Sequence, residues 1–370
     1  MSAPRNRLRF HAVTVAGLRP VAADGSAVAV TFAVPLELRP AFAFAPGQHV
    51  TVRARVGGQS VRRAYSLCST PADLDERGTL TIGVRRVPGG VFSSHANSAL
   101  RVGDRLELLP PVGAFRADFD PARRRHFAAV AGGSGITPVL SLVRTGLAVE
   151  PLSSCTVLYG DRGADSMMFA EDLAELKNAY VDRLQLVPAF SREDPPVGLA
   201  GGRLHAARLG AVIARTLPPA AVAEWFVCGP LGLVRAAREA LAGLGVGADA
   251  VHAEFFHTGA APAPPVAPPV ALPAGDGRGR RVTVVLDGRT VTVPVGGGQS
   301  LLDAALEARP ELPYSCRNGV CATCRARVVD GRARMAGNWS LSAEEQAAGY
   351  VLTCRAVPVT EHVTVDFDVV

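Results

Sequence analysis

Lysine is almost absent from this sequence: among 370 residues the only lysine is Lys177, while arginine occurs 38 times. The arginines are scattered and form no basic stripe interleaved with aromatic residues, so the charge pattern gives no indication of a nucleic-acid partner. Long apolar runs are missing as well. No segment is long enough to cross a bilayer, and the N-terminus lacks the apolar stretch of a secretory signal peptide. We therefore expect a cytoplasmic protein without a membrane partner.

Histidine and cysteine are also scarce, but the cysteines follow a pattern. The eight histidines show no ligand spacing, which argues against a mononuclear metal site. Four of the seven cysteines follow the spacing C-x4-C-x2-C-x29-C, the plant-type arrangement for a [2Fe–2S] cluster. The predicted cluster ligands are Cys316, Cys321, Cys324 and Cys354.

Two other interpretations of these four cysteines fit less well. Structural zinc sites normally use two paired short loops, whereas here three thiolates share one loop and the fourth is isolated. A disulfide pair would require an oxidising compartment, which nothing at the N-terminus indicates. The other cysteines are expected to be packing residues without a nucleophilic role: Cys68 and Cys155 in the core, and Cys228 in a wall beside a nucleotide.

Length and composition indicate several domains. The chain is too long for one ordinary core, and residues 258–281 are rich in proline, alanine and glycine, which is typical of a semi-extended tether. This tether separates a predicted cluster domain, 282–370, from residues 1–122 and 123–257. Residues 282–370 carry a net charge of −2, which leaves +8 on the preceding part, and opposite signs favour docking of the two parts.

Residues 8–120 predict an antiparallel β-barrel, because short alternating strands are separated by frequent turn signals. The candidate strands are 8–15, 27–32, 49–56, 62–68 and 79–86. Arg63-Ala64-Tyr65-Ser66 fits the motif R-x-Y-S, and Pro46-Gly47-Gln48 precedes it. A guanidinium can bind a phosphate in a forked geometry, and an aromatic face can pack on a flavin ring. A glycine-rich turn with a serine follows at 89–93, where backbone N–H groups can hold a pyrophosphate.

These motifs, in this order, resemble the ferredoxin–NADP reductase family. The resemblance implies that Arg63 binds the flavin pyrophosphate, Tyr65 stacks on the isoalloxazine and Ser66 reaches its reactive edge. It also places the late element Glu254-Phe255-Phe256 against the flavin. The residues expected at FAD are Arg63, Tyr65, Ser66, Gly89, Gly90, Val91, Phe92, Ser93, Thr137, Glu254 and Phe256.

From residue 124 onward, strands alternate with helices, one of which is expected over residues 167–180, and this alternation predicts an α/β domain with a parallel sheet. The buried strand 127–131 runs into Gly132-Gly133-Ser134-Gly135-Ile136-Thr137-Pro138, so a glycine-rich turn opens a helix whose N-terminus can face a pyrophosphate. This segment resembles the G-G-S-G-I-T-P of the same family. The residues expected at the nicotinamide nucleotide are Gly132, Gly133, Ser134, Gly135, Thr137, Pro138, Arg162, Ser191, Arg192, Cys228, Gly229 and Pro230.

The choice between NADPH and NADH depends on what surrounds the adenosine ribose. Ser191-Arg192 follows the strand 184–189 and resembles the pair that binds the 2′-phosphate in NADPH-dependent members, with Arg162 on the neighbouring strand. NADPH is therefore favoured. Asp161 and Glu193 keep NADH open, since an acidic residue at the ribose is typical of NADH selectivity.

Residues 282–370 predict an α+β ferredoxin domain of the β-grasp type. Asp287-Gly288 lies between two alternating β-branched runs, a strong hairpin signal. Ser300 and Asp303 form a start like a capping box for the helix 301–308, and the cysteine loop follows.

Three further parts of the chain carry a closer resemblance: Ser166-Met167-Met168-Phe169, the cysteine loop 316–324, and residues 347–354 with 365–368. They resemble the family of reductase subunits of phenylacetyl-CoA epoxidase complexes; the resemblance covers all three domains and is most specific over residues 312–368. The resemblance implies electron transfer from NADPH through FAD and a [2Fe–2S] cluster to an oxygenase with a di-iron centre. The alternatives are a reductase for a ring-hydroxylating, steroid or alkane oxygenase, and a flavin and iron–sulfur sensor that does not turn over nicotinamide. Arg317, Arg325 and Arg327 form either a docking face for an acidic partner or a solvated basic rim.

Overall fold

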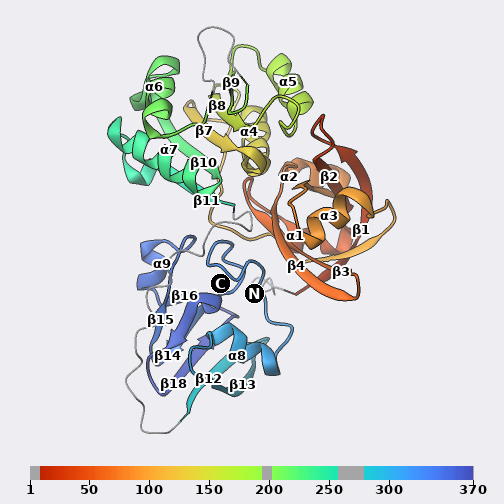
Figure 1. The fold of residues 1–370 in the computed structure, drawn as a ribbon, viewed down its shortest axis with the longest axis vertical. Coiled ribbons are helices and arrows are strands. Elements are labelled where there is room, and N and C mark those ends of the chain that lie inside the picture. The colour runs from red at the N-terminus through yellow and green to blue at the C-terminus, as the bar shows by residue number, and fades with distance from the viewer. Residues whose placement is uncertain (1–8, 194–201, 257–278, 370) are drawn as a thin grey trace.

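The computed structural model describes residues 9–193, 202–256 and 279–369, which fold into three units, each with its own main sheet (Figure 1). The predicted tether 258–281 lies outside the described residues, except for its last three. Among the helices of the described part, none combines the length and apolar character needed to span a bilayer.

The first unit is the antiparallel barrel that the turn pattern predicted. Its six strands pair in the order β4-β3-β6-β1-β2-β5, and a bridge between Leu67 and Ile82 joins the two edges of the sheet. Buried side chains such as Phe32 and Leu80 fill its interior. The strands are β1 His11–Pro20, β2 Ala27–Ala33, β3 His49–Val56, β4 Gln59–Ser66, β5 Thr79–Arg85 and β6 Arg105–Leu108; the helices are α1 Arg39–Phe42, α2 Pro71–Arg77 and α3 Val91–Ser98.

The second unit is the predicted α/β domain, with a fully parallel sheet in the order β11-β10-β7-β8-β9. Helix α5 begins at Ala170 rather than at Met167 as the sequence suggested, because Phe169 adopts a left-handed conformation with φ 58°. The strands are β7 His126–Gly132, β8 Ser154–Asp161, β9 Leu184–Phe190, β10 Val222–Gly229 and β11 Val251–Phe255; the helices are α4 Ile136–Val149, α5 Ala170–Ala179, α6 Ala206–Thr216 and α7 Leu231–Gly243.

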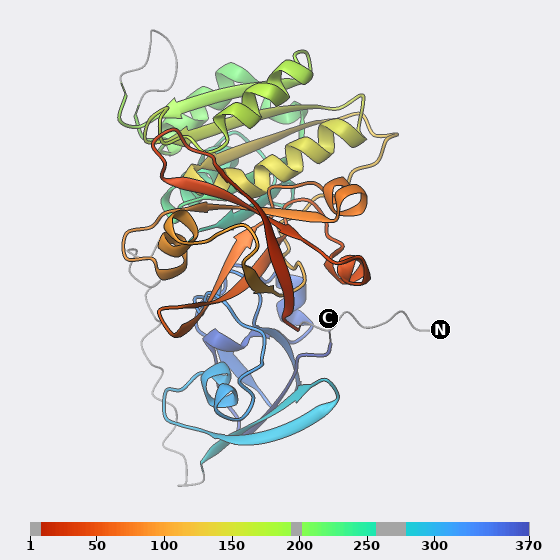
Figure 2. The same ribbon diagram turned by 90° about the vertical axis from the view of Figure 1, so that its right-hand side faces the viewer.

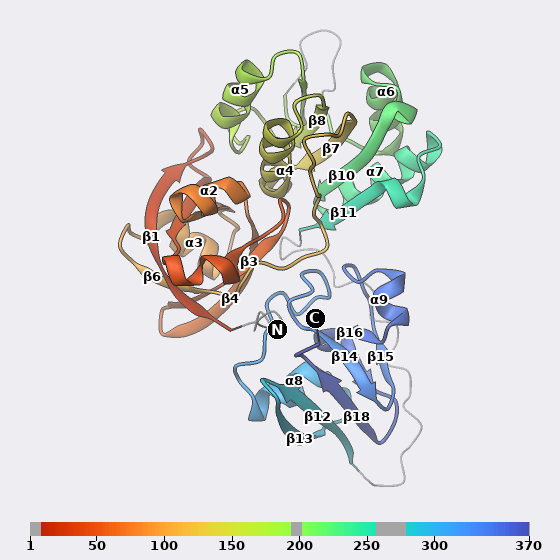
Figure 3. The ribbon, with the colours of Figure 1, turned by 180° about the vertical axis from the view of Figure 1, so that it is seen from behind.

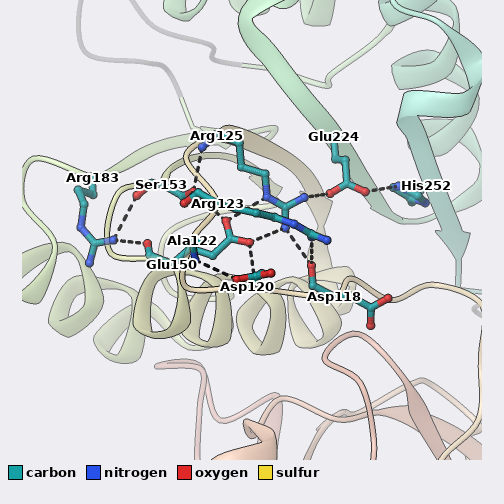
Figure 4. A network of polar contacts seen from close by, with 10 residues as sticks. All are labelled: Asp118, Asp120, Ala122, Arg123, Arg125, Glu150, Ser153, Arg183, Glu224 and His252. Atoms are coloured by element: carbon teal, nitrogen blue, oxygen red, sulfur yellow. Dashed lines mark hydrogen bonds and ion pairs between the residues drawn. The ribbon is translucent and has the colours of Figure 1, made fainter.

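A partly buried network of ion pairs links the start of this second unit to the rest of the unit (Figure 4). Arg125 forms an ion pair with Glu150 at 3.0 Å and a second one with Glu224, which also contacts His252 on β11. The Glu150 side chain is completely buried, and Ser153 donates a hydrogen bond to it. The network therefore ties the segment that enters β7 to helix α4 and to two strands of the sheet.

The third unit has a mixed five-stranded sheet in the order β13-β12-β18-β14-β16, in which β12 and β18 are parallel. The Asp287-Gly288 hairpin is confirmed, with both residues at positive φ, and the Ser300 hydroxyl caps α8 by accepting a bond from the Asp303 N–H. The elements are β12 Arg280–Leu286, β13 Arg289–Val295, α8 Leu301–Ala308, β14 Arg325–Asp330, β15 Ala333–Met335, α9 Ala343–Ala347, β16 Tyr350–Leu352, β17 Ala356–Pro358 and β18 His362–Asp366.

The three units are in contact. Figures 2 and 3 show the third unit below the other two, with the loop between α8 and β14 turned towards β3, β4 and β11. Thr51 of β3 contacts Thr323 of this loop at 3.3 Å, and Phe255 of β11 packs against Trp339 with ring centroids 5.0 Å apart.

Candidate functional site

The four predicted cluster ligands converge in two pairs. The thiol of Cys316 interacts with that of Cys321, and the thiol of Cys324 with that of Cys354. Cys321 and Cys324 are buried, whereas Cys316 and Cys354 are half-buried. Cys316, Cys321 and Cys324 lie in the loop between α8 and β14, and Cys354 follows β16, so the fourth predicted ligand comes from a distant strand.

The loop backbone is shaped to stabilise negative charge on sulfur. Arg317, Gly319 and Ala322 all have positive φ, a conformation that costs non-glycine residues of order 1–3 kcal/mol and is found at functional sites. The Asn318 N–H points at the Cys316 sulfur at 3.4 Å. A hydrogen bond from the Cys321 thiol, helped by backbone N–H groups, lowers the pKa of Cys316 to about 6 against the effect of burial.

This donor set fits a two-iron cluster better than a single ion. Within the described residues, no group of three or more cysteine, histidine or acidic side chains converges tightly enough to hold one metal ion. A [2Fe–2S] cluster is held by four cysteines, and two pairs of thiolates could provide two ligands for each iron. The residues that would hold the cluster are Cys316, Cys321, Cys324 and Cys354.

The expected flavin residues of the barrel lie on β4 and at the start of α3. Tyr65 packs against Phe92 with ring centroids 5.5 Å apart, and the exposed Arg63 donates a hydrogen bond to its neighbour's carbonyl. The Ser66 hydroxyl donates to Glu254 at 3.4 Å, so β4 and β11 meet at this point although 188 residues separate the two side chains.

The turn that precedes α3 has the features of an anion site. Gly89 has φ 71°, and a side chain at this position would point into open space. The helix begins at Val91, so its first backbone N–H groups have no partner within the helix. The Ser93 hydroxyl accepts a bond from the Val87 N–H and donates one to the Gly90 carbonyl. The hydroxyl thus holds the turn together, which leaves the backbone N–H groups for a pyrophosphate.

A partly buried acid, Glu254, and a buried histidine, His49, lie close to each other, and His49 also faces the backbone of the cysteine loop. The carboxylate of Glu254 is 3.8 Å from the His49 ring. Burial raises the pKa of Glu254 to about 8, with the Ser66 hydrogen bond acting in the opposite direction. Burial lowers the pKa of His49 to about 4, which the backbone of Cys321 partly opposes. Both shifts favour the uncharged forms of the two side chains.

The glycine-rich segment at the end of β7 has a backbone without bulky side chains, which a pyrophosphate could approach closely. Gly133 has φ 53°, and a Cβ at Gly135 would collide with the Cys228 carbonyl, so both positions require glycine. The Thr137 hydroxyl donates to the Ser134 carbonyl at 2.9 Å, and its methyl group faces Gly83 of the barrel. Pro138 lies in the first turn of α4. This segment therefore lies where the first two units meet.

Cys228 and Gly229 end β10, and Pro230 precedes α7 at the same edge of the sheet as the glycine-rich turn. Burial raises the pKa of the Cys228 thiol well above its ordinary range, which agrees with a packing role. Cys68 and Cys155 are buried in the core, as expected. Phe256, the phenylalanine of the E-x-F element, packs against the hydrophobic core that contains these three cysteines.

Near the expected ribose site, the two acidic side chains have partners within the protein, whereas the two arginines are exposed. Asp161 is 1% exposed in its side chain and is held by Arg85 at 2.8 Å. Glu193 accepts a hydrogen bond from the Ala164 N–H at 2.6 Å. Arg162 and Arg192 are exposed and adjacent, since the Arg192 N–H donates to the Arg162 carbonyl at 2.8 Å.

Several residues of this region were not identified from the sequence. His49 follows the Pro46-Gly47-Gln48 segment directly, and Arg62 precedes Arg63, but neither belongs to the motif used. Arg85 neutralises Asp161, and Gly83 allows Thr137 to approach the barrel. No local signal marks these residues, because each acts through a partner that is distant in the sequence.

Comparison with known proteins agrees with this geometry. Three family models match successive parts of the chain: an oxidoreductase FAD-binding domain over residues 25–117, an oxidoreductase NAD-binding domain over 129–239 and a 2Fe-2S iron-sulfur cluster binding domain over 284–359. A structure of phthalate dioxygenase reductase superposes with a TM-score of 0.55 at 22% identity, covering 97% of this chain and 98% of that one.

Curated relatives match over nearly the whole length. The chain is 40% identical to one of the subunits of 1,2-phenylacetyl-CoA epoxidase from Escherichia coli K12, over 97% of this chain and 98% of that protein. It is 34% identical to the ferredoxin reductase component of 3-ketosteroid-9-alpha-monooxygenase from Rhodococcus rhodochrous, over 91% and 92% of the two chains. The chain therefore belongs to the family of oxygenase reductases that join FAD-binding, NAD-binding and [2Fe–2S] domains and that includes this component of phenylacetyl-CoA epoxidase.

Proposed function

We propose that this chain is the NADPH-dependent reductase of a phenylacetyl-CoA epoxidase, and that it supplies electrons to a di-iron oxygenase component. When bound, FAD accepts a hydride and a [2Fe–2S] cluster carries single electrons, a conversion that protein side chains cannot perform. The observation that carries the proposal is the contact between the cysteine loop and the strand next to the flavin motif, where Thr323 meets Thr51. The contact supports the proposal because it brings the loop of the predicted cluster ligands against the domain that carries the predicted flavin residues.

In this proposal the residues of the barrel would hold and orient the flavin. Arg63 and the N–H groups at the start of α3 provide donors for a pyrophosphate, while Tyr65 provides an aromatic surface for the flavin ring. Glu254 accepts a hydrogen bond from Ser66 at the end of β4, and burial favours its protonated form, in which the carboxyl group can also donate a hydrogen bond.

The preference for NADPH rests on which charges are free at the ribose site. Asp161 and Glu193, the two carboxylates that would accept the hydroxyls of NADH, are held by Arg85 and by the Ala164 N–H. Arg162 and Arg192 are exposed and lie side by side, which suits a 2′-phosphate dianion.

The choice of oxygenase rests on the relative with 40% identity over 97% of the chain. Reconstitution tests it. The purified reductase is combined with the oxygenase component of a phenylacetyl-CoA epoxidase or, as the control, of a 3-ketosteroid 9α-monooxygenase. We expect NADPH-dependent consumption of phenylacetyl-CoA and little steroid turnover. Efficient turnover of the steroid alone would assign the chain to the second class of oxygenase.

A further inference from the structure

One arginine of the barrel makes an extensive contact with the ferredoxin domain. Arg62, on β4, is 8% exposed. Its guanidinium donates one hydrogen bond to the Leu312 carbonyl and another to the Pro310 carbonyl, each at 2.9 Å. The same group lies 4.2 Å from the centre of the Tyr314 ring and 5.0 Å from that of Phe10. A forked cation between two rings and two carbonyls is a specific arrangement that other side chains cannot reproduce.

The position of Arg62 connects the two cofactor sites. It precedes Arg63 of the R-x-Y-S motif, and successive side chains of a strand point to opposite faces. Arg63 is exposed, whereas Arg62 is turned into the ferredoxin domain. The carbonyls that Arg62 binds belong to the segment that leads directly to Cys316.

Two further contacts fix the orientation of the ferredoxin domain around this point. Thr51 is paired across the sheet with Ala64 and contacts Thr323, which lies between Cys321 and Cys324. On the other side, Trp339 packs edge-on against Phe255 of β11 and joins the apolar core of the nucleotide domain. Three separate contacts define one relative orientation. Among the contacts described for the barrel, the one through Arg62 combines charge, hydrogen bonding and ring packing.

We propose that Arg62 is a positioning residue that clamps the ferredoxin domain onto the flavin domain and so holds the cluster ligands at the distance that fast electron transfer requires. Arg62 touches none of the expected cofactor residues through its guanidinium; it acts through the backbone of Pro310 and Leu312 and through Tyr314. The inference rests on the proposed path from flavin to cluster, but the orientation of the domain can be measured independently of that path.

The test uses the full-length holoprotein with Arg62→Ala and Arg62→Lys, and Arg55→Ala as the control. Arg55 is an exposed arginine of the neighbouring strand β3, so its removal changes the charge by the same amount. Stopped-flow absorbance separates reduction of the flavin by NADPH from reduction of the cluster, and small-angle scattering reports the overall dimensions. Tyr314→Leu removes the contact from the ferredoxin side without altering β4.

We expect flavin reduction within about twofold of wild type for every variant. Cluster reduction should slow by about tenfold or more in Arg62→Ala and Tyr314→Leu, because release of the ferredoxin domain lets the two cofactor sites move apart and lose their held geometry. The radius of gyration should increase in both. Arg62→Lys should be intermediate, since an ammonium keeps the charge but not the fork, and Arg55→Ala should match wild type.

Wild-type scattering together with wild-type cluster reduction in Arg62→Ala and Tyr314→Leu would overturn the proposal. An enlarged radius with an unchanged rate would also overturn it, because the clamp would then have no role in electron transfer. A different result would refute the proposed function and leave the clamp intact. In that case the radius of gyration would increase in Arg62→Ala, but NADPH would not reduce the cluster even in the wild type.

Discussion

Replacing Arg192 with alanine should weaken the preference for NADPH over NADH. Arg192 follows β9 and is exposed, so a bond to the 2′-phosphate is charge-assisted but partly screened by water. A hydrogen bond to a charged group contributes about 1.5–3 kcal/mol, and exposure places Arg192 towards the lower end of that range. We therefore expect KM for NADPH to rise about 10- to 30-fold, since about 1.4 kcal/mol corresponds to tenfold in affinity.

The matched measurement is binding of 2′,5′-ADP and of 5′-AMP, which differ only in the phosphate in question. Affinity for 2′,5′-ADP should fall by the same factor as KM for NADPH rises, while 5′-AMP and NADH should be unaffected. Arg215→Ala removes an exposed arginine of helix α6 and serves as the control. An equal loss for both nucleotides, or a wild-type preference for NADH, would refute the assignment of Arg192 to the phosphate.

Three further outcomes follow from the described contacts. Cys354→Ser should abolish the visible absorption and EPR signal of the cluster while FAD content and transfer from NADPH to ferricyanide persist; an intact [2Fe–2S] signal would disprove the ligand set. Because the pKa of Glu254 is raised from 4.5 to about 8, the folded chain keeps a proton that the unfolded chain loses, so stability should decline between these pH values. The Tm of Glu254→Gln minus the Tm of the wild type should therefore increase from pH 5 to pH 8, and a difference that does not depend on pH would contradict this. Glu150→Gln removes one of the two carboxylates that pair with Arg125 and leaves Glu224 as the other, so it should lower the free energy of unfolding by about 1–3 kcal/mol in chemical denaturation, whereas Glu175→Gln on the surface of α5 should cost almost nothing.

The sequence predicted the elements that depend on local rules. The Asp287-Gly288 hairpin and the start of α8 at Leu301 agree with the structure, because turn geometry and capping involve residues next to each other in the chain. The parallel sheet of the nucleotide domain also agrees, since alternating strands and helices leave little choice of topology. The boundary of α5 was misplaced because Phe169 adopts a left-handed conformation that its type does not favour.

The contacts between domains could not be predicted from the sequence. The pairing of Asp161 with Arg85 removes an acid that seemed available to NADH, and Arg85 is 76 residues away. Ion pairs within the ferredoxin domain were not predicted either. Two arginines of its basic rim are neutralised by acids: Arg317 pairs with Asp303 and Arg325 with Glu345, each at 3.1 Å. Arg327 remains exposed and donates to a backbone carbonyl. These pairings depend on the folded arrangement, so residue type and spacing alone could not indicate them.

The central claim is that the chain takes electrons from NADPH through FAD to a [2Fe–2S] cluster, and an anaerobic titration with NADPH tests it most directly. A flavin stores two electrons and the cluster one, so we expect about three electron equivalents per chain, with flavin bleaching and the appearance of the EPR signal of a reduced cluster. Cys321→Ser should accept about two equivalents and show no such signal. Uptake of only two equivalents by the wild-type chain, with the cluster present but still oxidised after the flavin is reduced, would contradict the claim.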